Sequence, residues 1–223
     1  MRLENRLLSV SAAVFALMLL VGAAASYAVP GSISIAEARA LPLGTEVTVD
    51  GSVTTPSGAF ESSFFDVGFG LQDNTAGIYV SLQTNLGVAP RAQARVTGVL
   101  ADSFGLLILV PADPAEVKIH GSGPRVRPEW IHTADVSEAT EGRLVQVVGT
   151  VSQAPFSDLP FGYIFFVDDG SGEAQIFVNV QTGIDVSTIS LGQLVSVTGF
   201  SSQFADHYEI DPRSPADIAF PSP

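Results

Sequence analysis

The sequence predicts an all-β protein built from two tandem copies of one small five-stranded barrel. Three observations support this prediction. Short apolar segments alternate with polar residues, glycine and proline separate these segments, and four sequence blocks recur at a spacing of roughly 100 residues. The length of 223 residues and an apolar content of 46% are sufficient for two small cores.

Residues 1–28 have the features of a cleaved export signal. Two arginines flank a polar start, the apolar run 7–25 follows, and Ser26 and Ala28 fit the small-x-small pattern of a cut after Ala28. An uncleaved anchor helix is the alternative, because the run is long enough to span a bilayer. In either case we expect the rest of the chain to be secreted, periplasmic or at the cell envelope, with no stable membrane span after cleavage.

Acidic residues outnumber basic ones, and the net charge is −13. Removal of residues 1–28 would leave 22 acidic and eight basic residues. Such a charge repels polyanions unless the few cations are clustered. The chain has no cysteine, which excludes disulfides, thiolate metal sites, thiol nucleophiles and a lipid-modified cysteine anchor.

The internal repeat consists of four blocks that occur in the same order in both halves. Segments 44–53, 71–80, 94–98 and 111–117 match segments 142–151, 167–178, 195–199 and 212–218. The recurrence of all four in one order predicts two domains, at 29–120 and 129–223, joined by a linker at 121–128 that is rich in glycine and proline.

Each domain is expected to begin with a short helix or turn, followed by strands. Ser34 and Glu37 form a capping-box pattern, and 133–142 is a weaker counterpart in the second copy. Segment 47–53 alternates apolar and polar residues as a half-buried strand does. Turn residues at 74–77 and 169–172 predict hairpins, and Gly98 and Gly199 permit the sharp bend of a small barrel.

Between the third and fourth strands, segments 83–93 and 181–193 would accommodate a marginal helix. Five strands, a hairpin between the second and third, and a connection before the fourth describe the strand order of an OB-fold. A pair of β-sandwiches is the competing architecture, but about 90 residues with five strands is small for one.

Segment 34–54, together with Leu71-Gln-Asp73 and Gly77-Ile-Tyr-Val80, resembles the OB-fold-like domains of secreted bacterial proteins. The resemblance covers nearly all of 33–119 and, more loosely, 129–219. Such domains often accompany extracellular nuclease or phosphatase modules and are described as nucleic-acid-binding. Here the two copies fill the mature chain without a nuclease or phosphatase module, so the resemblance specifies the fold better than the ligand.

Aromatic residues are the candidate ligand contacts, because OB-folds bind on the face of strands 2 and 3 and at the loops beside it. Exposed rings in these places would stack on bases or sugars. The alternatives are that the loop rings close the barrel ends as part of the core, and that Tyr79 and Phe177 pack one barrel against the other. The candidates are Phe60, Tyr79, Phe104, Phe156, Phe161, Phe177, Phe204 and Tyr208.

No catalytic or metal-binding pattern stands out. Segment 168–173 superficially resembles a calcium loop, but its flanks are strands and Asp-Gly turn chemistry explains it. His120, His132 and His207 lack metal-ligand spacing, and the sequence has no Gly-x-Ser-x-Gly elbow. We therefore expect a protein that is not an enzyme and uses no cofactor or metal.

Two functions remain as hypotheses. The first is a non-catalytic binding module whose partner is a protein or glycan of the cell envelope, which agrees with the export signal and the acidic charge. The alternative is weak binding of single-stranded nucleic acid outside the cell, as the resemblance implies. A cationic groove beside Phe104 or Phe204 would distinguish the second from the first.

Overall fold

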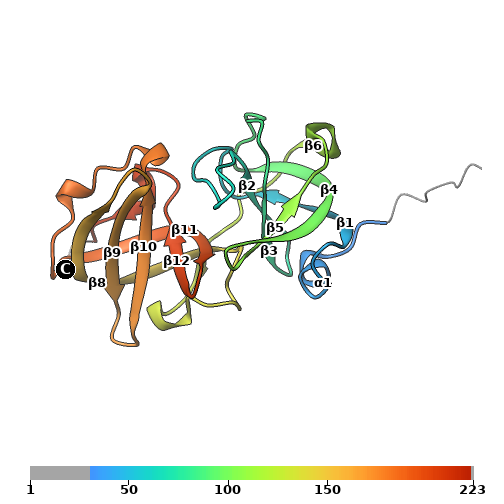
Figure 1. The fold of residues 1–223 in the computed structure, drawn as a ribbon. Coiled ribbons are helices and arrows are strands. Elements are labelled where there is room, and N and C mark those ends of the chain that lie inside the picture. Colours follow the sequence, from blue (N-terminus) through green and yellow to red (C-terminus); the bar gives the residue numbers. More distant parts are fainter. Residues whose placement is uncertain (1–30, 222–223) are drawn as a thin grey trace, which may run out of the picture.

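The computed structural model describes residues 31–221, which form two β-sheets side by side (Figure 1). The predicted export signal at residues 1–28 lies outside the described residues. Within residues 31–221, no helix is long and apolar enough to cross a membrane.

The first sheet closes into a five-stranded barrel. Its strands pair in the order β1-β2-β3-β5-β4, and β4 pairs with β1 to complete the ring. The β3–β5 pair is parallel and the other pairs of the ring are antiparallel. The elements of this half are α1 (Ile35–Arg39), β1 (Glu46–Val53), β2 (Phe69–Gln72), β3 (Gly77–Val80), β4 (Ala92–Ser103), β5 (Leu106–Val110), the 3₁₀ turn η1 (Pro114–Glu116) and the edge strand β6 (Val117–Ser122).

The second sheet has the same pairing order. Its strands follow β8-β9-β10-β12-β11, β11 pairs with β8, and only β10–β12 is parallel within this ring. The elements are β7 (Glu129–Trp130), η2 (Thr133–Asp135), β8 (Leu144–Asp158), β9 (Gly162–Asp168), β10 (Glu173–Asn179), η3 (Val180–Thr182), η4 (Val186–Thr188), β11 (Leu194–Phe204), β12 (His207–Asp211), η5 (Pro215–Asp217) and β13 (Ile218–Ala219).

The predicted all-β class and a closed OB-like barrel are confirmed. The expected helix is absent from segment 83–93, where Gly87 has a φ of +64° and Pro90 follows. In the second half the corresponding segment forms short 3₁₀ turns, and the opening helix expected at 133–142 is the single turn η2. β6 ends at Ser122 and β7 begins at Glu129, on either side of the irregular segment 123–128.

An aspartate in the β2–β3 hairpin joins that hairpin to the opening helix of the first half. Asp73 accepts hydrogen bonds from the backbone N–H groups of Ile35, Thr75 and Ala76 at 2.7–2.9 Å. Ser34 caps the same helix, and the predicted capping box with Glu37 is present. These hydrogen bonds, together with burial of Ile35 in the barrel core, account for the position of α1.

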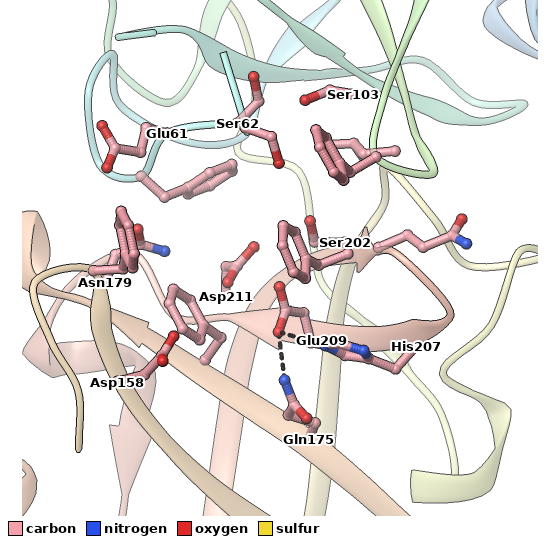
Figure 2. A pocket seen from close by; sticks show the side chains of 18 of the residues that line it. Glu61, Ser62, Ser103, Asp158, Gln175, Asn179, Ser202, His207, Glu209 and Asp211 are labelled. Carbon is pink, nitrogen blue, oxygen red and sulfur yellow. Dashed lines mark hydrogen bonds and ion pairs between the residues drawn. The ribbon is translucent and has the colours of Figure 1, made fainter. Parts of the chain in front are cut away.

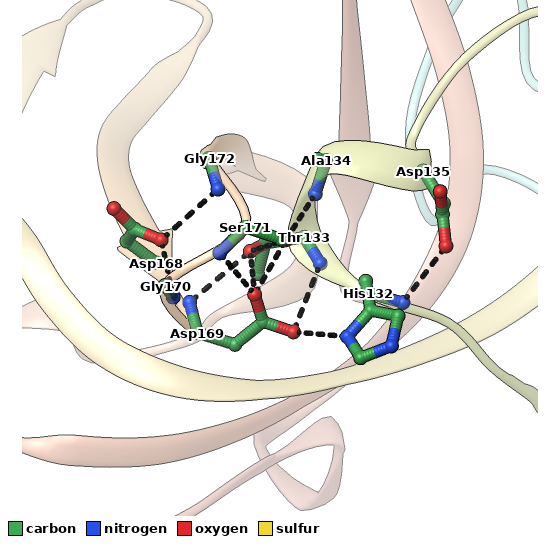
Figure 3. A network of polar contacts seen from close by, with 9 residues as sticks. All are labelled: His132, Thr133, Ala134, Asp135, Asp168, Asp169, Gly170, Ser171 and Gly172. Carbon is green, nitrogen blue, oxygen red and sulfur yellow. Dashed lines mark hydrogen bonds and ion pairs between the residues drawn. The ribbon is translucent and has the colours of Figure 1, made fainter.

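The second half repeats this arrangement around Asp169 (Figure 3). The Asp169 carboxylate accepts from Thr133 Oγ1 and from Ser171 N, and its Oδ2 lies 2.8 Å from His132 Nδ1. These hydrogen bonds hold the pKa of Asp169 far below its usual range, with the Ser171 hydroxyl as the largest cause. The segment that resembles a calcium loop is therefore a hairpin turn whose oxygens already have donors from the protein.

A buried aromatic cluster joins the closed barrel to the second sheet, whose ring of paired strands is called the second barrel below. Phe200 of β11 lies against Phe60 and Tyr79 of the first barrel, with ring centroids 5.1 Å and 6.0 Å away, and all three side chains are buried. Each barrel also has its own apolar core, so this third cluster is additional to both. Burial of large aromatic rings is the main apolar contribution to docking.

Polar contacts surround the aromatic cluster. Arg39 of α1 forms ion pairs with Glu138 and with the buried carboxylate of Glu141, at 2.8 Å and 3.0 Å. The Gln72 side chain accepts a hydrogen bond from Leu144 N at 2.8 Å. Arg213 donates to the backbone oxygen of Thr54 at 2.7 Å. Because these bonds connect separate segments of the two halves, they fix the orientation of one barrel on the other.

We predict that Gly77→Ala will destabilise the docked pair of barrels. A methyl group at Gly77 would overlap the backbone carbonyl of Gly142 in the other barrel, and neither backbone has a flexible end that can yield. Overpacking of this kind costs about 1–3 kcal/mol, which urea denaturation will measure. Gly31→Ala is the control, because no atom lies within 4 Å of its added carbon. Equal stability of the two variants would contradict the prediction.

Candidate functional site

A cavity of about 500 Å³ lies between the two barrels (Figure 2). The β1–β2 loop and the β4–β5 turn of the first barrel form one side, and strands β10, β11 and β12 with the β8–β9 loop form the other. Its principal lining residues are Phe60, Glu61, Ser62, Phe65, Ser103, Phe104, Leu106, Asp158, Phe161, Gln175, Phe177, Asn179, Ser202, Phe204, His207, Glu209 and Asp211.

Two pairs of phenylalanines flank this cavity, and each pair has one ring from each barrel. Phe104 and Phe204 stack with centroids 5.9 Å apart and planes 11° apart. Phe65 and Phe161 lie 6.3 Å apart in a tilted arrangement. All four rings remain exposed, between 43% and 66%, although each also lines the cavity. Half-exposed rings at a cavity are available to contact a ligand.

The buried carboxylate of Asp66 shapes the loop that contributes Phe60, Glu61, Ser62 and Phe65. It accepts hydrogen bonds from Ser62 N at 3.0 Å, Ser62 Oγ at 2.7 Å and Tyr79 OH at 2.7 Å. Ser81 Oγ of the segment after β3 donates to its other oxygen. The long β1–β2 loop is therefore fixed to the barrel wall, and its cavity residues are held in place.

The β4–β5 and β11–β12 turns meet at the cavity. Ala205 N donates to the backbone oxygen of Phe104 at 2.6 Å, and Gly105 forms an isolated bridge with Phe204. Phe104 and Ala205 both have a φ of +54°. A positive φ at a bulky residue is uncommon and strained, and such backbone is concentrated at functional sites. Phe104 lines the cavity from this turn.

Two carboxylates of β12 form the polar floor of the cavity. Glu209 and Asp211 alternate with the core residue Ile210, so both lie on the outer face of their barrel, where the first barrel covers them. Their exposures are 6% and 3%. Gln175 Nε2 donates to Glu209 Oε2 at 2.7 Å, and His207 Nε2 lies 4.0 Å from the same oxygen (Figure 2).

Burial changes the ionisation of this pair. Loss of hydration raises the pKa of Glu209 to about 7. Burial, and then the charge of neighbouring Glu209, raise the pKa of Asp211 well above its usual value. Two carboxyl groups that resist ionisation are thus held beside a cavity, which is an arrangement typical of functional sites.

Two polar atoms at the cavity have no hydrogen-bond partner among the described residues, namely Ser103 Oγ and Asp211 Oδ1. The lining also includes Glu61 and Asp158, and none of the described lining residues is lysine or arginine. The described lining therefore combines aromatic faces with acidic oxygens, and His207 is its one basic side chain.

Six of the eight aromatic candidates lie in or beside this cavity. Phe104, Phe161, Phe177 and Phe204 line it, and Phe60 lines it while packing in the barrel contact. Tyr79 is fully buried in that contact, where its hydroxyl donates to Asp66, so it packs one barrel on the other. Burial and the Asp66 charge raise the Tyr79 pKa well above its usual value.

Phe156 and Tyr208 lie elsewhere, and both were expected in loops. Phe156 belongs to the long strand β8, where its ring is half-exposed and outside the cavity lining. Tyr208 belongs to β12, and its hydroxyl donates to Glu138 Oε2 at 3.3 Å. Phe204 is likewise the last residue of β11, so the turn that follows it is shorter than expected.

Sequence reasoning missed Phe65, Glu209 and Asp211. A signal for the two carboxylates exists in the repeat itself. The strand registers show that Ile108 and Val110 of β5 are the counterparts of Glu209 and Asp211 of β12. Apolar residues in one copy and acids in the other mark a position where the halves differ in chemistry. Phe65 has no such signal, because its loop lies outside the matched blocks.

Within residues 31–221, no group of three or more histidine and acidic side chains is arranged to hold a metal ion. His132 contacts Asp169 in the hairpin network, and this hydrogen bond raises the His132 pKa. Among the histidines of the described chain, His207 is the one that lines the cavity.

No protein-family model matches the chain, and no curated protein matches its sequence. Similar solved structures include a murine DNA-binding protein bound with double-stranded DNA, at 11% identity and a TM-score of 0.40, covering 79% of this chain and 97% of that one. The p204 HINb domain has 13% identity and a TM-score of 0.36, covering 75% of this chain and 91% of that one. An OBody bound to hen egg-white lysozyme has 20% identity and a TM-score of 0.35, covering 44% of this chain and 99% of that one.

We predict that Asp66→Ala will destabilise the protein by roughly 2–4 kcal/mol, because four donors lose one charged acceptor inside the structure. Thermal or urea unfolding will measure this loss. Glu61→Ala is the control, since Glu61 is a carboxylate of the same loop that does not accept a comparable set of hydrogen bonds. A cost no larger than that of the control would show that Asp66 does not organise the loop.

We predict that Glu209 makes the folded state less stable as the pH rises. Its pKa of about 7 lies above the ordinary value of 4.5, so the folded protein retains a proton that the unfolded chain loses. This contribution is complete below about pH 4.5 and is lost as the pH rises through 7. Glu209→Gln should therefore be more stable than the wild type at pH 8, by about 1–2 kcal/mol.

The measurement is the difference in unfolding free energy between wild type and Glu209→Gln at pH 4.5, 6, 7 and 8. Taking the difference removes the opposite contribution of carboxyls with lowered pKa values, such as Asp50 and Asp73. A difference that does not change with pH would contradict the assignment.

Proposed function

We propose that the protein is a non-catalytic, exported module of two docked OB-type barrels that binds a ligand in the cavity between them. The ligand class that the cavity favours is the terminal part of a glycan at the cell envelope. The observation that carries this proposal is a cavity with phenylalanine rings from both barrels and unpartnered buried oxygens on Ser103 and Asp211.

The size and chemistry of the cavity support a small ligand. About 500 Å³ is within the usual range for small-molecule sites, which are largely apolar with a few convergent polar groups. Ring faces suit the C–H faces of a sugar, while Gln175, Asn179 and Ser202 offer hydrogen-bonding groups for hydroxyls. Because both barrels contribute, their fixed docking would keep the site preorganised, which reduces the entropic cost of binding.

The repeat supports two barrels of one ancestry. The Asp73 and Asp169 networks join equivalent hairpins to equivalent opening segments, with Thr75 and Ser171 in matching roles. The second sheet also has the ring of pairings that closes the first. A tandem duplication explains both observations.

Weak binding of single-stranded nucleic acid is the second candidate. Exposed Phe104 and Phe204 would stack on bases. One similar structure is a murine DNA-binding protein bound with DNA, but its TM-score of 0.40 is too low to assign that function to this chain. None of the comparisons concerns an envelope partner. The charge of the site decides our preference, because the acidic side chains of Glu61 and Asp158 would repel phosphates at the same rings.

The cations of the described chain are also placed unfavourably for phosphate contacts at the cavity. Arg39, Arg95, Arg143 and Arg213 form ion pairs with acidic side chains. Arg91 directly precedes β4, while Lys118, Arg125 and Arg127 belong to β6 and the segment after it. None of these four residues lines the cavity. A nucleic-acid site at the cavity would therefore lack the contacts that normally supply affinity.

We predict that glycans from cell-envelope preparations bind the purified protein and that Phe104→Ala weakens this binding at least tenfold, by loss of ring stacking. A glycan array followed by calorimetry with the best ligand will measure it. Phe156→Ala, an exposed ring outside the cavity, is the control and should bind normally.

Labelled single-stranded DNA is titrated in parallel at low and moderate salt. Salt-sensitive DNA binding that requires Phe204, in the absence of glycan binding, would replace the proposal with the second candidate. An equal loss of glycan affinity in the Phe104→Ala and Phe156→Ala variants would exclude the cavity as the binding site.

A further inference from the structure

We propose that the cavity between the barrels recognises a ligand that carries a protonated amine, with the ammonium group held by Glu209 and Asp211 and surrounded by phenylalanine rings. This inference rests on the proposed binding function and adds the charge of the ligand. On a glycan, such a group is the free amine of an amino sugar.

The first argument is the unsatisfied floor of the cavity. Asp211 is 3% exposed, lines the cavity, and has no hydrogen-bond partner at Oδ1. Glu209 has a single hydrogen bond, from the neutral amide of Gln175. A buried carboxyl oxygen without a hydrogen-bond partner is costly, and a ligand N–H would supply the missing bond at Asp211 Oδ1. An ammonium group provides up to three donors, and its positive charge favours the ionised form of both carboxyl groups, whose pKa values are raised by burial.

The second argument is the surrounding charge. The acidic groups near Glu209 come from several elements: Asp158 from β8, Asp211 from β12 itself, and Glu61 from the β1–β2 loop of the other barrel. His207 of β12 is the one titratable base in the lining of the described chain. Figure 2 shows Glu61 on one side of the cavity and Glu209 and Asp211 on the other. The field at the centre therefore favours a cation.

The third argument is the aromatic lining, which is independent of the carboxylates. Six phenylalanines contribute. Phe104 stacks on Phe204, and Phe65 pairs with Phe161. Ring faces attract cations through their quadrupole, more strongly when the cation is shielded from water. Rings and acids together are the combination that selects an organic cation over a neutral ligand of the same shape.

The experiment compares cyclohexylamine, which is protonated at pH 8, with cyclohexanol, which has nearly the same shape and no charge. Both are titrated into the purified protein by calorimetry. We expect the amine to bind at least tenfold more tightly than the alcohol. Glu209→Gln and Asp211→Asn should each reduce the ratio of amine affinity to alcohol affinity to threefold or less.

Glu46→Gln is the control, because Glu46 is an exposed carboxylate at the start of β1 and lies outside the cavity lining. It should retain the full preference for the amine. Unfolding temperatures of all variants show whether each is folded. If Asp211→Asn does not fold, the wild-type pH profile replaces it, and amine affinity should fall by up to about tenfold per pH unit below 7.

Equal affinity for amine and alcohol would overturn the inference and leave the proposed ligand-binding function in place. The same conclusion follows if neutral glycans bind in a Phe104-dependent manner while the amine does not. Binding of the amine without any glycan would support the inference and remove the glycan assignment. Failure of every small ligand to bind would refute both.

Discussion

The ring of Phe200 lies 5.1 Å from that of Phe60, and this buried contact with Tyr79 sets the distance between the two barrels. Most features of the candidate site depend on that distance. It places the Phe104 and Phe204 turns against each other, and it covers Glu209 and Asp211, which would otherwise be on an outer barrel face. The raised pKa values of these acids are therefore consequences of docking rather than of the β12 strand itself.

The site also depends on a difference between two similar halves. Equivalent loops carry the two flanking pairs of rings, Phe104 with Phe204 and Phe65 with Phe161, so these rings are similar in the two halves. The β5 and β12 faces are not, because Ile108 packs in the aromatic cluster while Glu209 lines the cavity. One barrel contributes apolar contact area and its partner contributes charge. A repeat can acquire a specific site in this way while both copies keep the same core pattern.

The fold was largely predictable, because alternation and turn residues depend on neighbours within a few residues, and the recurring blocks repeat the same pattern in both halves. The capping box at Ser34 and the hairpin at 169–172 are examples. The site was predictable only in part. Exposed phenylalanines in loops suggested Phe104 and Phe204, whereas Tyr79 looked equally suited to a ligand and to the barrel contact. Burial of Glu209 arises from residues more than a hundred positions away, and no local pattern reports such a contact.

A cavity built from two barrels has a thermodynamic consequence for the chain as a whole. Any ligand that contacts both walls gains affinity only in the docked arrangement, so its binding free energy is added to the stability of that arrangement. The ligand then acts as a removable cross-link between halves that the irregular segment 123–128 connects covalently. Ligand binding and docking of the two barrels are therefore linked equilibria. A force that separates the barrels would lower the affinity for the ligand, and a bound ligand would resist their separation.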